Sequence, residues 1–220
     1  MPVGGYLTHA YRSVSTPAVT THQTDVTRHK LLEAAFCEIH RHGFQAASIA
    51  NILQDTGLTK GALYHHFPTK RDLGLAVVEE VVAGLLDELV FGRLRTSDEP
   101  VATLIEIIGQ RGGIGTEAVV LGCPLNNLMQ EMSPLDTTFK EKLNAILNTW
   151  TRTVEDALRR GQEAGVLRPD VDCRAAALFI TSAWEGCVGV AKNLQSPAKL
   201  RRCMQQLQGY VRSLMAAATA

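Results

Sequence analysis

The sequence predicts an all-α protein with nine helices in two parts. Apolar residues recur at helical spacing along most of the chain, and no stretch alternates apolar and polar residues as a half-buried strand would. Residues that favour helix ends separate the apolar stretches, with Ser, Thr or Asp before them and Gly or Pro after them. All seven histidines lie before residue 67, which distinguishes the first part of the chain from the second.

The composition is that of a globular protein. Its 220 residues are 45% hydrophobic, enough for a sizeable core, and the net charge is +0, so any affinity for nucleic acid must be local. No apolar run reaches the roughly 18 residues of a membrane-spanning helix, and residues 1–24 lack the apolar centre of a signal peptide. We expect a cytoplasmic protein without membrane contact, in which residues 1–24 form a disordered tail.

The cysteines are odd in number and widely spaced, without a CxxC pair. This pattern supports neither a zinc site nor a disulfide framework, so we expect buried, reduced thiols and neither a metal nor another cofactor. The five are Cys37, Cys123, Cys173, Cys187 and Cys203.

Three short helices and one long helix are predicted from residue 25 onward. The short helices are bounded by residues that cap or end helices: Asp25 to Gly43, Ser48 to Gly57, and Thr59 to Pro68. The long helix follows Thr69, and its apolar side chains form two adjacent rows from Leu73 to Val90. So wide an apolar surface predicts burial on two sides.

Three further helices are predicted around Val101–Ile108, around Leu125–Met132, and from near Thr137 to Glu163. We expect a loop or irregular stretch over Gly109–Gly122. Its sequence GQRGGIG suggests a phosphate-binding loop, but it lacks the Lys-Ser/Thr pair and a preceding strand, so a flexible connection is the preferred interpretation.

The last two predicted helices suggest a homodimer. The eighth, after Asp172, is rich in small residues that permit close helix approach, and the ninth, from Pro197, carries a heptad-like seam that suits a partner helix. We expect two copies of this pair to form a four-helix interface across a two-fold axis. The predicted interface residues are Ala176, Ala183, Leu200, Met204, Leu207, Val211 and Leu214.

One segment, GLTKGALYHHFPTKRDL at residues 57–73, concentrates positive charge. No acidic residue lies between Thr56 and Arg71, although the chain as a whole is neutral. Gly57 stands where two short helices must reverse direction, a position that favours a positive φ. The pattern predicts a helix-turn-helix, whose second helix can enter the major groove of double-stranded DNA.

Small residues near the start of this second helix let it approach DNA closely, and polar residues beside it can contact phosphate. The start of the next helix adds N–H groups and a positive dipole that favour phosphate. The predicted DNA contacts are Ser48, Thr59, Lys60, Gly61, Ala62, Tyr64, His65, Thr69 and Lys70.

At these residues the chain resembles the TetR/AcrR family of bacterial transcriptional regulators. The resemblance rests on an ordered set: Gly57, Lys60, Gly61, Leu63, Tyr64, Phe67 and Lys70. It implies a DNA-binding domain over residues 25–72 and a ligand-binding and dimerisation domain over residues 73–220. It also implies a homodimer, expected to be a repressor, that releases a palindromic operator when a small-molecule effector binds. Three residues depart from the family pattern: Ala50, Asn51, and Leu53 where a small alanine is usual.

Large apolar side chains in the second part are candidates to line an effector cavity. Methionine adapts to irregular shapes, and tryptophan offers a flat apolar wall with one polar edge. As a group they favour a largely apolar effector, although each alone also fits plain core. The predicted ligand-binding residues are Asn127, Met129, Met132, Phe139, Trp150 and Trp184.

Two alternatives remain at this point. Cys123 precedes Pro124 at a predicted helix start, where the helix dipole can lower the pKa of a thiol, so Cys123 could sense oxidants or electrophiles. The other alternative is a helical enzyme that retains a vestigial DNA-binding domain. Because no histidine follows His66 and no paired-carboxylate motif is present, we expect no enzymatic activity.

Overall fold

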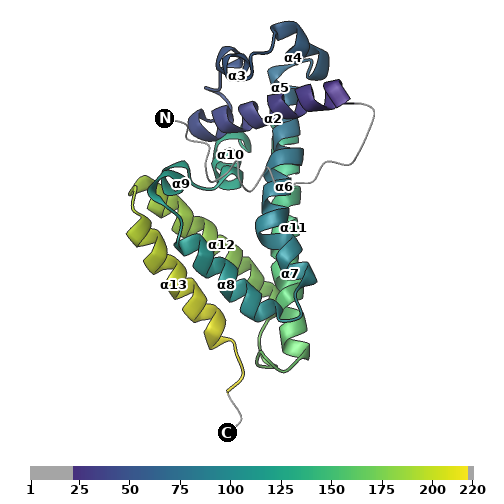
Figure 1. The fold of residues 1–220 in the computed structure, drawn as a ribbon. Helices are drawn as coiled ribbons and strands as arrows, with labels where there is room; N and C mark the ends of the chain where they lie inside the picture. The colour runs from purple at the N-terminus through teal and green to yellow at the C-terminus, as the bar shows by residue number, and fades with distance from the viewer. Residues whose placement is uncertain (1–21, 218–220) are drawn as a thin grey trace. The chain divides into compact units, whose positions relative to one another are not determined.

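The computed structural model describes residues 22–217, and this part of the chain is all-α, as the sequence predicted (Figure 1). Among these residues, β-type pairing is confined to one isolated bridge between Leu167 and Met215. The predicted tail lies outside the described residues as far as residue 21, and His22 already begins the first described helix. The chain divides into two compact units, Met1–Leu85 with Pro124–Asn144, and Leu86–Cys123 with Ala145–Ala220.

The first unit contains the predicted short helices. Its elements are α2 (His22–His42), α3 (Ile49–Thr56), α4 (Lys60–His66), α5 (Lys70–Ala76), the π-helix η1 (Val77–Val82), α10 (Pro124–Met132) and the start of α11 (Thr137–Glu163). The predicted caps are confirmed, because Ser48, Thr59 and Thr69 each accept a backbone N–H of the helix that follows. Gly57 has a φ of 68°, the left-handed conformation that the turn requires.

The core of the first unit joins the connection after α2 to α5, α10 and α11. The rings of Phe44 and Phe139 lie 4.8 Å apart. They close over Gly74, where an added Cβ would lie 2.3 Å from a ring carbon of Phe44. The carboxylate of Glu131 accepts the N–H groups of Phe44 and Gln45 at 2.8 and 2.7 Å, and so fixes the chain that leads into α3.

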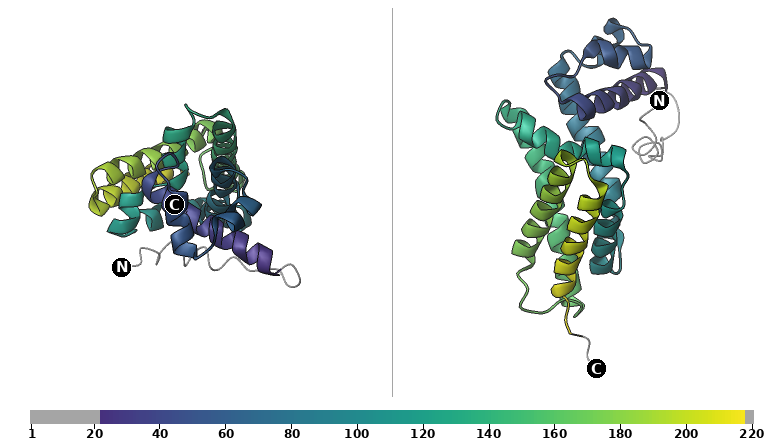
Figure 2. Two further views of the ribbon diagram at one scale, coloured as in Figure 1. Left: turned by 90° about the horizontal axis from the view of Figure 1, so that it is seen from above. Right: turned by 90° about the vertical axis from the view of Figure 1, so that its left-hand side faces the viewer.

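The second unit is a set of longer helices. It contains the π-helix η2 (Asp87–Phe91), α7 (Gly92–Thr96), α8 (Pro100–Gly112), α9 (Thr116–Leu121), the rest of α11, α12 (Cys173–Asn193) and α13 (Pro197–Ser213). The boundary between the units falls within α6 (Ala83–Leu86). Helices α8, α12 and α13 lie side by side, as the views in Figure 1 and Figure 2 agree. Within the described part of the chain, no helix is both long and apolar enough to cross a bilayer.

The prediction of a loop over Gly109–Gly122 is wrong for most of this stretch. Helix α8 continues to Gly112, and Thr116–Leu121 form α9. The glycines of α8 serve close packing instead, because a Cβ on Gly112 would lie 3.1 Å from the Cβ of Met204 on α13. Gln208 of α13 crosses the same contact and donates a hydrogen bond to the carbonyl of Ile105 at 2.8 Å.

The seam of α13 faces the chain's own helices. Its members are at most 8% exposed and lie against α8 and α12: Leu200, Met204, Leu207, Val211 and Leu214. Ala176 on α12 is also buried, and Ala183 is half-buried. Side chains that are covered within one chain offer no surface to a second copy, so a dimer must use other residues. The heptad-like spacing therefore reflects packing inside the chain.

The expectation that all cysteines are reduced is also wrong. Cys187 of α12 and Cys203 of α13 form a disulfide, with their Cα atoms 5.7 Å apart. Cys37, Cys123 and Cys173 take part in no disulfide. The 16-residue separation did not reveal the pair, because only the side-by-side packing of α12 and α13 brings the two sulfur atoms together.

A carboxyl group lies inside the second unit. Glu185 of α12 is 8% exposed. Burial raises the pKa of Glu185 from its ordinary value of 4.5 to about 7, while a hydrogen bond with the Cys123 thiol and the charge of Arg111 act in the opposite direction. The neighbouring Trp184 packs edge-to-face on Trp150 of α11, with ring centroids 5.5 Å apart.

Glu185 predicts a pH-dependent stability. Between pH 4.5 and 7 the folded chain holds a proton on Glu185 that the unfolded chain has lost, so stability decreases as the pH rises through this range. The free energy of unfolding falls by about 3 kcal/mol over this range, because each unit of pKa difference corresponds to about 1.4 kcal/mol. Glu185→Gln should therefore raise the melting temperature at pH 8 and leave it nearly unchanged at pH 4.5. The matched control is Glu163→Gln, at an exposed position of α11. Equal pH slopes in wild type and Glu185→Gln would contradict the assignment.

Candidate nucleic-acid interface

Helix α4 is held by its ends and by its buried side. Thr59 accepts the N–H of Ala62 at 3.2 Å and so caps the first turn. Leu63 is fully buried and Phe67, which follows the helix, is 3% exposed. These two residues fix the rotation of α4 about its axis, so the opposite side of the helix faces solvent.

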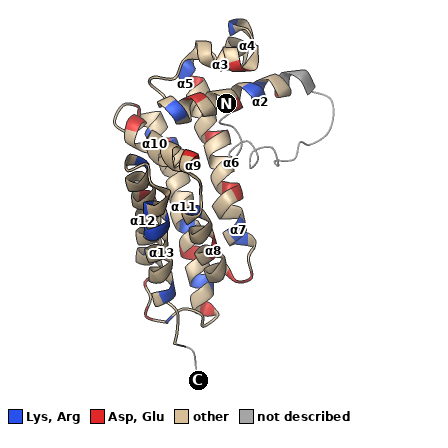
Figure 3. Cartoon of the chain, turned by 60° about the vertical axis from the view of Figure 1, so that its left-hand side comes forward, with Lys and Arg blue, Asp and Glu red and all other residues tan. Residues whose placement is uncertain are grey.

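The solvent side of α4 is polar and carries no acidic residue. It consists of Lys60, Gly61, Tyr64 and His65, all of them exposed, and we call it the α4 face. These positions share one side because residues four apart lie above one another on a helix. Figure 3 shows a basic position at α4. The sequence of α4, KGALYHH, contains no acidic residue. Ala62 is half-buried and lies at the edge of this face. A helix with such a surface can approach an anionic polymer.

The next histidine, His66, is half-buried. Burial lowers the pKa of His66, and the charges of His65 and Arg28 lower it further. The neutral form is therefore favoured near pH 7. His66 adds no fixed charge to the α4 face there.

The serine and the two threonines among the predicted DNA contacts differ in whether their O–H groups can still donate a hydrogen bond. Ser48 and Thr59 use their oxygen atoms as acceptors in the N-caps, so each keeps an O–H donor. Thr69 donates its O–H to Asp72 at 2.7 Å and accepts the N–H of Asp72 at 3.1 Å. Its donor is therefore occupied in the capping box.

The three cations of the segment also differ. Lys60 is exposed at the first position of α4. The ammonium group of Lys70 donates to the carbonyl of Gln45 at 3.0 Å and lies 5.1 Å from the ring centroid of Phe44. Because an ammonium group has three donors, Lys70 can bond Gln45 and still meet a phosphate.

Arg71 is engaged in a second contact within the first unit. Its guanidinium donates to both carboxylate oxygens of Asp136, at 2.6 and 2.9 Å. Hydrogen bonding from Arg71 is the main reason that the pKa of Asp136 is lowered to about 2. Asp136 also accepts the N–H of Phe139 at the start of α11, so this pair joins α5 to α11.

Sequence reasoning missed the carboxylate that holds α3. Glu38 of α2 is 6% exposed, and its Oε1 accepts the N–H of Ser48 at 2.9 Å and the Nδ2–H of Asn51 at 3.0 Å. An acidic residue at position 51 would face this carboxylate, which explains why an amide suits this chain. The separation of 13 residues leaves no signal for the pair in the sequence.

The departure at Leu53 is accommodated. Leu53 is 9% exposed, and its carbonyl accepts the N–H of Gly57 at 2.9 Å, as the C-cap of α3 requires. The larger side chain is therefore part of the core between the helices. Ala50 is exposed on α3 and offers no polar group for DNA.

The predicted ligand-binding residues are distributed over both units. Met132 and Phe139 are buried in the first unit, where Met132 accepts a hydrogen bond from Gln45 and Phe139 packs on Phe44. Asn127 and Met129 are half-buried on α10. Trp150 and Trp184 pack together in the second unit.

Near the tryptophan pair, the second unit also contains polar groups. Cys123, which is 5% exposed, interacts with Glu185, and Arg111 donates to the carbonyl of Gly122 at 3.4 Å. Thiol and carboxyl groups thus accompany the two large rings inside the same unit.

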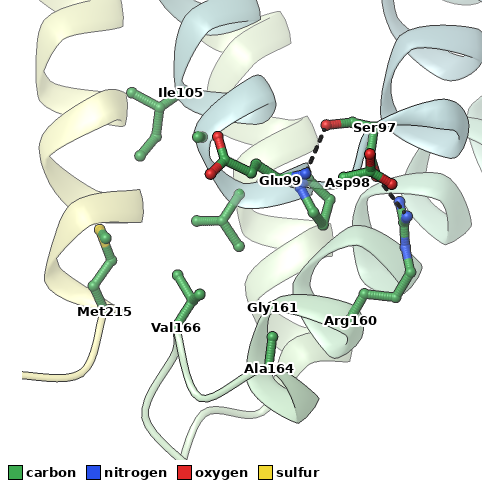
Figure 4. Close-up of a pocket in the computed structure, with 12 residues that line it drawn as sticks. Ser97, Asp98, Glu99, Ile105, Arg160, Gly161, Ala164, Val166 and Met215 are labelled. Carbon is green, nitrogen blue, oxygen red and sulfur yellow. Dashed lines mark hydrogen bonds between the residues drawn. The ribbon is translucent and has the colours of Figure 1, made fainter.

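A separate pocket of about 450 Å³ lies in the second unit (Figure 4). None of the predicted ligand-binding residues lines it. In Figure 4 the side chain of Glu99 extends toward the space bordered by Ile105, Val166 and Met215. Arg160 is turned to the wall of the pocket, where it donates to the carbonyl of Ser97 at 2.9 Å. The full lining is Ser97, Asp98, Glu99, Pro100, Val101, Ala102, Ile105, Arg160, Gly161, Ala164, Val166 and Met215.

Known proteins match both parts of the chain. Residues 31–77 match the family described as bacterial regulatory proteins, tetR family, and residues 111–207 match the tetracyclin repressor-like C-terminal domain. The chain is 32% identical over 166 residues to the transcriptional regulator AcuR of Cereibacter sphaeroides, which covers 74% of each protein. It is 24% identical over 173 residues to the HTH-type transcriptional repressor DhaR of a Mycobacterium species, covering 76% of this chain and 82% of the relative.

Solved structures share the fold. A TetR transcriptional regulator from Chloroflexus aurantiacus superimposes with a TM-score of 0.79 at 26% identity, covering 90% of this chain and 100% of that one. The regulatory protein TetR from Rhodobacter sphaeroides gives a TM-score of 0.75 at 27% identity, covering 84% and 98%. With a helix-turn-helix that exposes the α4 face, a matching C-terminal domain and these relatives, the chain belongs to the TetR family of DNA-binding bacterial transcriptional regulators.

Proposed function

We propose that this protein is a cytoplasmic repressor that binds a palindromic operator as a homodimer and releases it when a small, largely apolar effector binds. The α4 face carries the proposal, because it is exposed, lacks acidic residues and begins at a capped helix N-terminus. The relatives named above are transcriptional regulators, which favours regulation over catalysis.

In this proposal, α4 enters the major groove. Lys60 and Gly61 at its start meet base edges, and Tyr64 and His65 lie beside the groove, where they can contact phosphate. The free O–H groups of Ser48 and Thr59 donate to phosphate oxygens on either side. Lys70 contributes a phosphate contact from α5 while its bond to Gln45 holds it in place.

The two lysines should affect DNA binding differently. Lys60→Ala should change the sequences recovered from a pool of random duplexes, because Lys60 meets base edges. Lys70→Ala should recover the same sequences, but the magnitude of the log–log salt slope should fall by about 1, because one phosphate contact is lost. Filter binding at several salt concentrations measures the slope. Arg202→Ala, an exposed change on α13, is the control that should alter neither result. The roles assigned here are wrong if the two lysine variants exchange these effects.

The dimer proposed here uses the exposed row of α12 in place of the seam of α13. Four residues of α12 and its C-cap residue follow one another at four-residue steps, and all are exposed: Leu178, Ser182, Gly186, Val190 and the C-cap Leu194. We call this row the α12 stripe. Its three large side chains are 52–60% exposed. Phe179, also exposed, packs on Tyr210 of α13 with ring centroids 4.6 Å apart, which continues the apolar surface onto α13.

The α12 stripe fits a second copy of the same helix. Ser182 and Gly186 are small, so a partner helix can approach between the larger residues. Exposed apolar side chains grouped on one helix are typical of an interaction surface. Two copies of α12 and α13 then complete a four-helix interface across a two-fold axis.

Replacing Leu178 and Val190 together with glutamate should separate the dimer. Four carboxylates would be forced into the interface without partners, so the dissociation constant should rise by about a hundredfold or more. Sedimentation velocity across a concentration series measures this. Leu135→Glu changes an apolar residue that is 63% exposed in the first unit and should leave the dimer intact. A double variant that sediments as a tight dimer would rule out the α12 stripe.

The effector site proposed here lies around Trp150 and Trp184 in the second unit. The two rings offer apolar surface, and Glu185 and Cys123 provide polar groups in the same unit. The effector must prefer the released state, because equal affinity for both states shifts nothing. A preference of about a hundredfold corresponds to about 2.7 kcal/mol. The sensor alternative for Cys123 is less favoured, because its thiol is 5% exposed and engaged with Glu185.

Trp150→Phe tests this site without emptying the core. The probe is a compound from a screen of small, mostly apolar molecules. It is chosen because it raises the melting temperature of the wild-type chain. The variant should bind that compound about tenfold more weakly, because an aromatic wall is truncated, while operator affinity without the compound stays within about twofold. Trp184→Phe is the companion variant, and Phe36→Leu, at a buried aromatic residue of α2 in the first unit, is the control. If both tryptophan variants bind the compound as the wild type does, the two tryptophans belong to the hydrophobic core and do not form the effector site.

A further inference from the structure

The disulfide between Cys187 and Cys203 is unexpected in a DNA-binding regulator. Glutathione and thioredoxin keep thiols reduced where bacterial DNA lies, and disulfides there are usually transient, serving catalysis or redox sensing. A disulfide that joins two helices of the second unit therefore points to redox sensing here, whereas in a secreted protein it would point to stability alone. We propose that Cys187 and Cys203 form a reversible redox couple that exchanges with a low-molecular-weight anionic thiol and so regulates pairing of two copies.

The two sulfur atoms differ in access. Cys187 is 7% exposed on the inner side of α12, whereas Cys203 is half-buried on α13. An incoming thiolate therefore attacks Sγ of Cys203. The Cys187–Cys203 bond breaks, a mixed disulfide forms on Cys203, and Cys187 leaves as a thiolate that takes up a proton.

A second thiol completes the reduction. Its thiolate attacks the small-molecule sulfur of the mixed disulfide, so Cys203 is released as a thiolate and takes up a proton. Two thiols of the reductant become one disulfide, and two electrons and two protons arrive on the protein. Oxidation is the reverse reaction with the small-molecule disulfide, so no further reactant is needed.

The charge around Cys203 identifies the kind of thiol. Helix α13 contains no acidic residue, and exposed cations surround Cys203 in the sequence: Lys199, Arg201 and Arg202. Lys199 lies one turn before Cys203 on the same side of the helix. A positive surface raises the local concentration of an anion, which suits glutathione with its two carboxylates better than a neutral thiol.

The position of the bond connects it to the α12 stripe. Val190 lies on the helical turn after Cys187, and Leu194 caps the end of α12, so the disulfide holds this end of the stripe against α13. The bond closes the chain over 16 residues around the turn between the helices. Reduction removes this covalent restraint and leaves only the noncovalent contacts between α12 and α13, which include the seam and the Phe179–Tyr210 ring pair. Pairing through the stripe, which rests on the proposed function, should therefore be weaker in the reduced chain.

Thiol counting tests the couple without reference to DNA or dimerisation. The full chain is equilibrated in buffers with increasing ratios of reduced to oxidised glutathione and quenched in acid. It is then denatured and alkylated, and mass spectrometry counts the alkylated cysteines. We expect three alkylated cysteines at the oxidising end and five at the reducing end, with Cys187 and Cys203 changing together. A bond that survives the most reducing buffer is a fixed structural disulfide and overturns the proposal. Five free thiols in every buffer overturn it as well.

Thermal melting and sedimentation test the consequence. Reduction should lower the melting temperature by about 5–10 °C, the size expected for opening a loop of this length in a protein of this size. It should also raise the dimer dissociation constant by about tenfold. Cys203→Ser should behave as the reduced chain in both buffers, and Cys37→Ser should respond like wild type. Equal dimer affinity in oxidised wild type and Cys203→Ser overturns the link to pairing. A chain that never dimerises overturns that link and the proposed dimer together, while thiol counting still decides the redox couple.

Discussion

The packing of Phe44 and Phe139 over Gly74 is the constraint on which the DNA-binding unit depends. A Cβ at position 74 would overlap both rings, at 2.3 and 2.9 Å, so only glycine lets α5 approach them this closely. This contact brings together the chain after α2, helix α5 and the start of α11. Since α5 follows α4 after two residues and its N-cap Thr69, fixing α5 also limits where α4 can lie. Glu131 of α10 also holds the chain after α2, because its carboxylate accepts the N–H groups of Phe44 and Gln45. The Arg71–Asp136 ion pair joins α5 to the start of α11.

Most polar groups of the helix-turn-helix hold the motif together, and fewer remain for a ligand. Glu38, Thr69 and Asp72 are occupied within the unit, and Arg71 is paired with Asp136. The α4 face and the O–H groups of Ser48 and Thr59 remain available. Charge alone therefore overestimates the DNA-binding surface, because a cation that bonds its own fold has fewer donors for phosphate. Internal bonds also keep the exposed groups in fixed positions, which lowers the ordering cost of binding.

Local signals in the sequence predicted the fold well. The caps at Ser48, Thr59 and Thr69 and the glycine at position 57 act on their own helix ends, so they could be identified without tertiary structure. The face of α4 also followed from its seven-residue pattern. The predicted loop over Gly109–Gly122 failed because Gly112 is required by the nearby Met204 on another helix. The Cys187–Cys203 bond and the Glu38–Asn51 contact likewise depend on residues distant in the sequence. The seam of α13 was recognised correctly as a packing surface, but its spacing could not show that α8 and α12 of the same chain cover it.

Helix α12 places three different chemical groups close to one surface. Trp184, Glu185 and Cys187 occupy its buried side within four residues, and Gly186 and Val190 of the α12 stripe are their neighbours on the exposed side. An effector, a proton or a thiol that acts on the buried side therefore acts on the helix that carries the proposed interface. Thermodynamic linkage makes any such coupling reciprocal. If the disulfide strengthens pairing tenfold, then pairing must favour the disulfide tenfold, and the glutathione ratio at half-oxidation should shift with protein concentration. A disulfide that served stability alone, without coupling to the stripe, would have a midpoint independent of concentration.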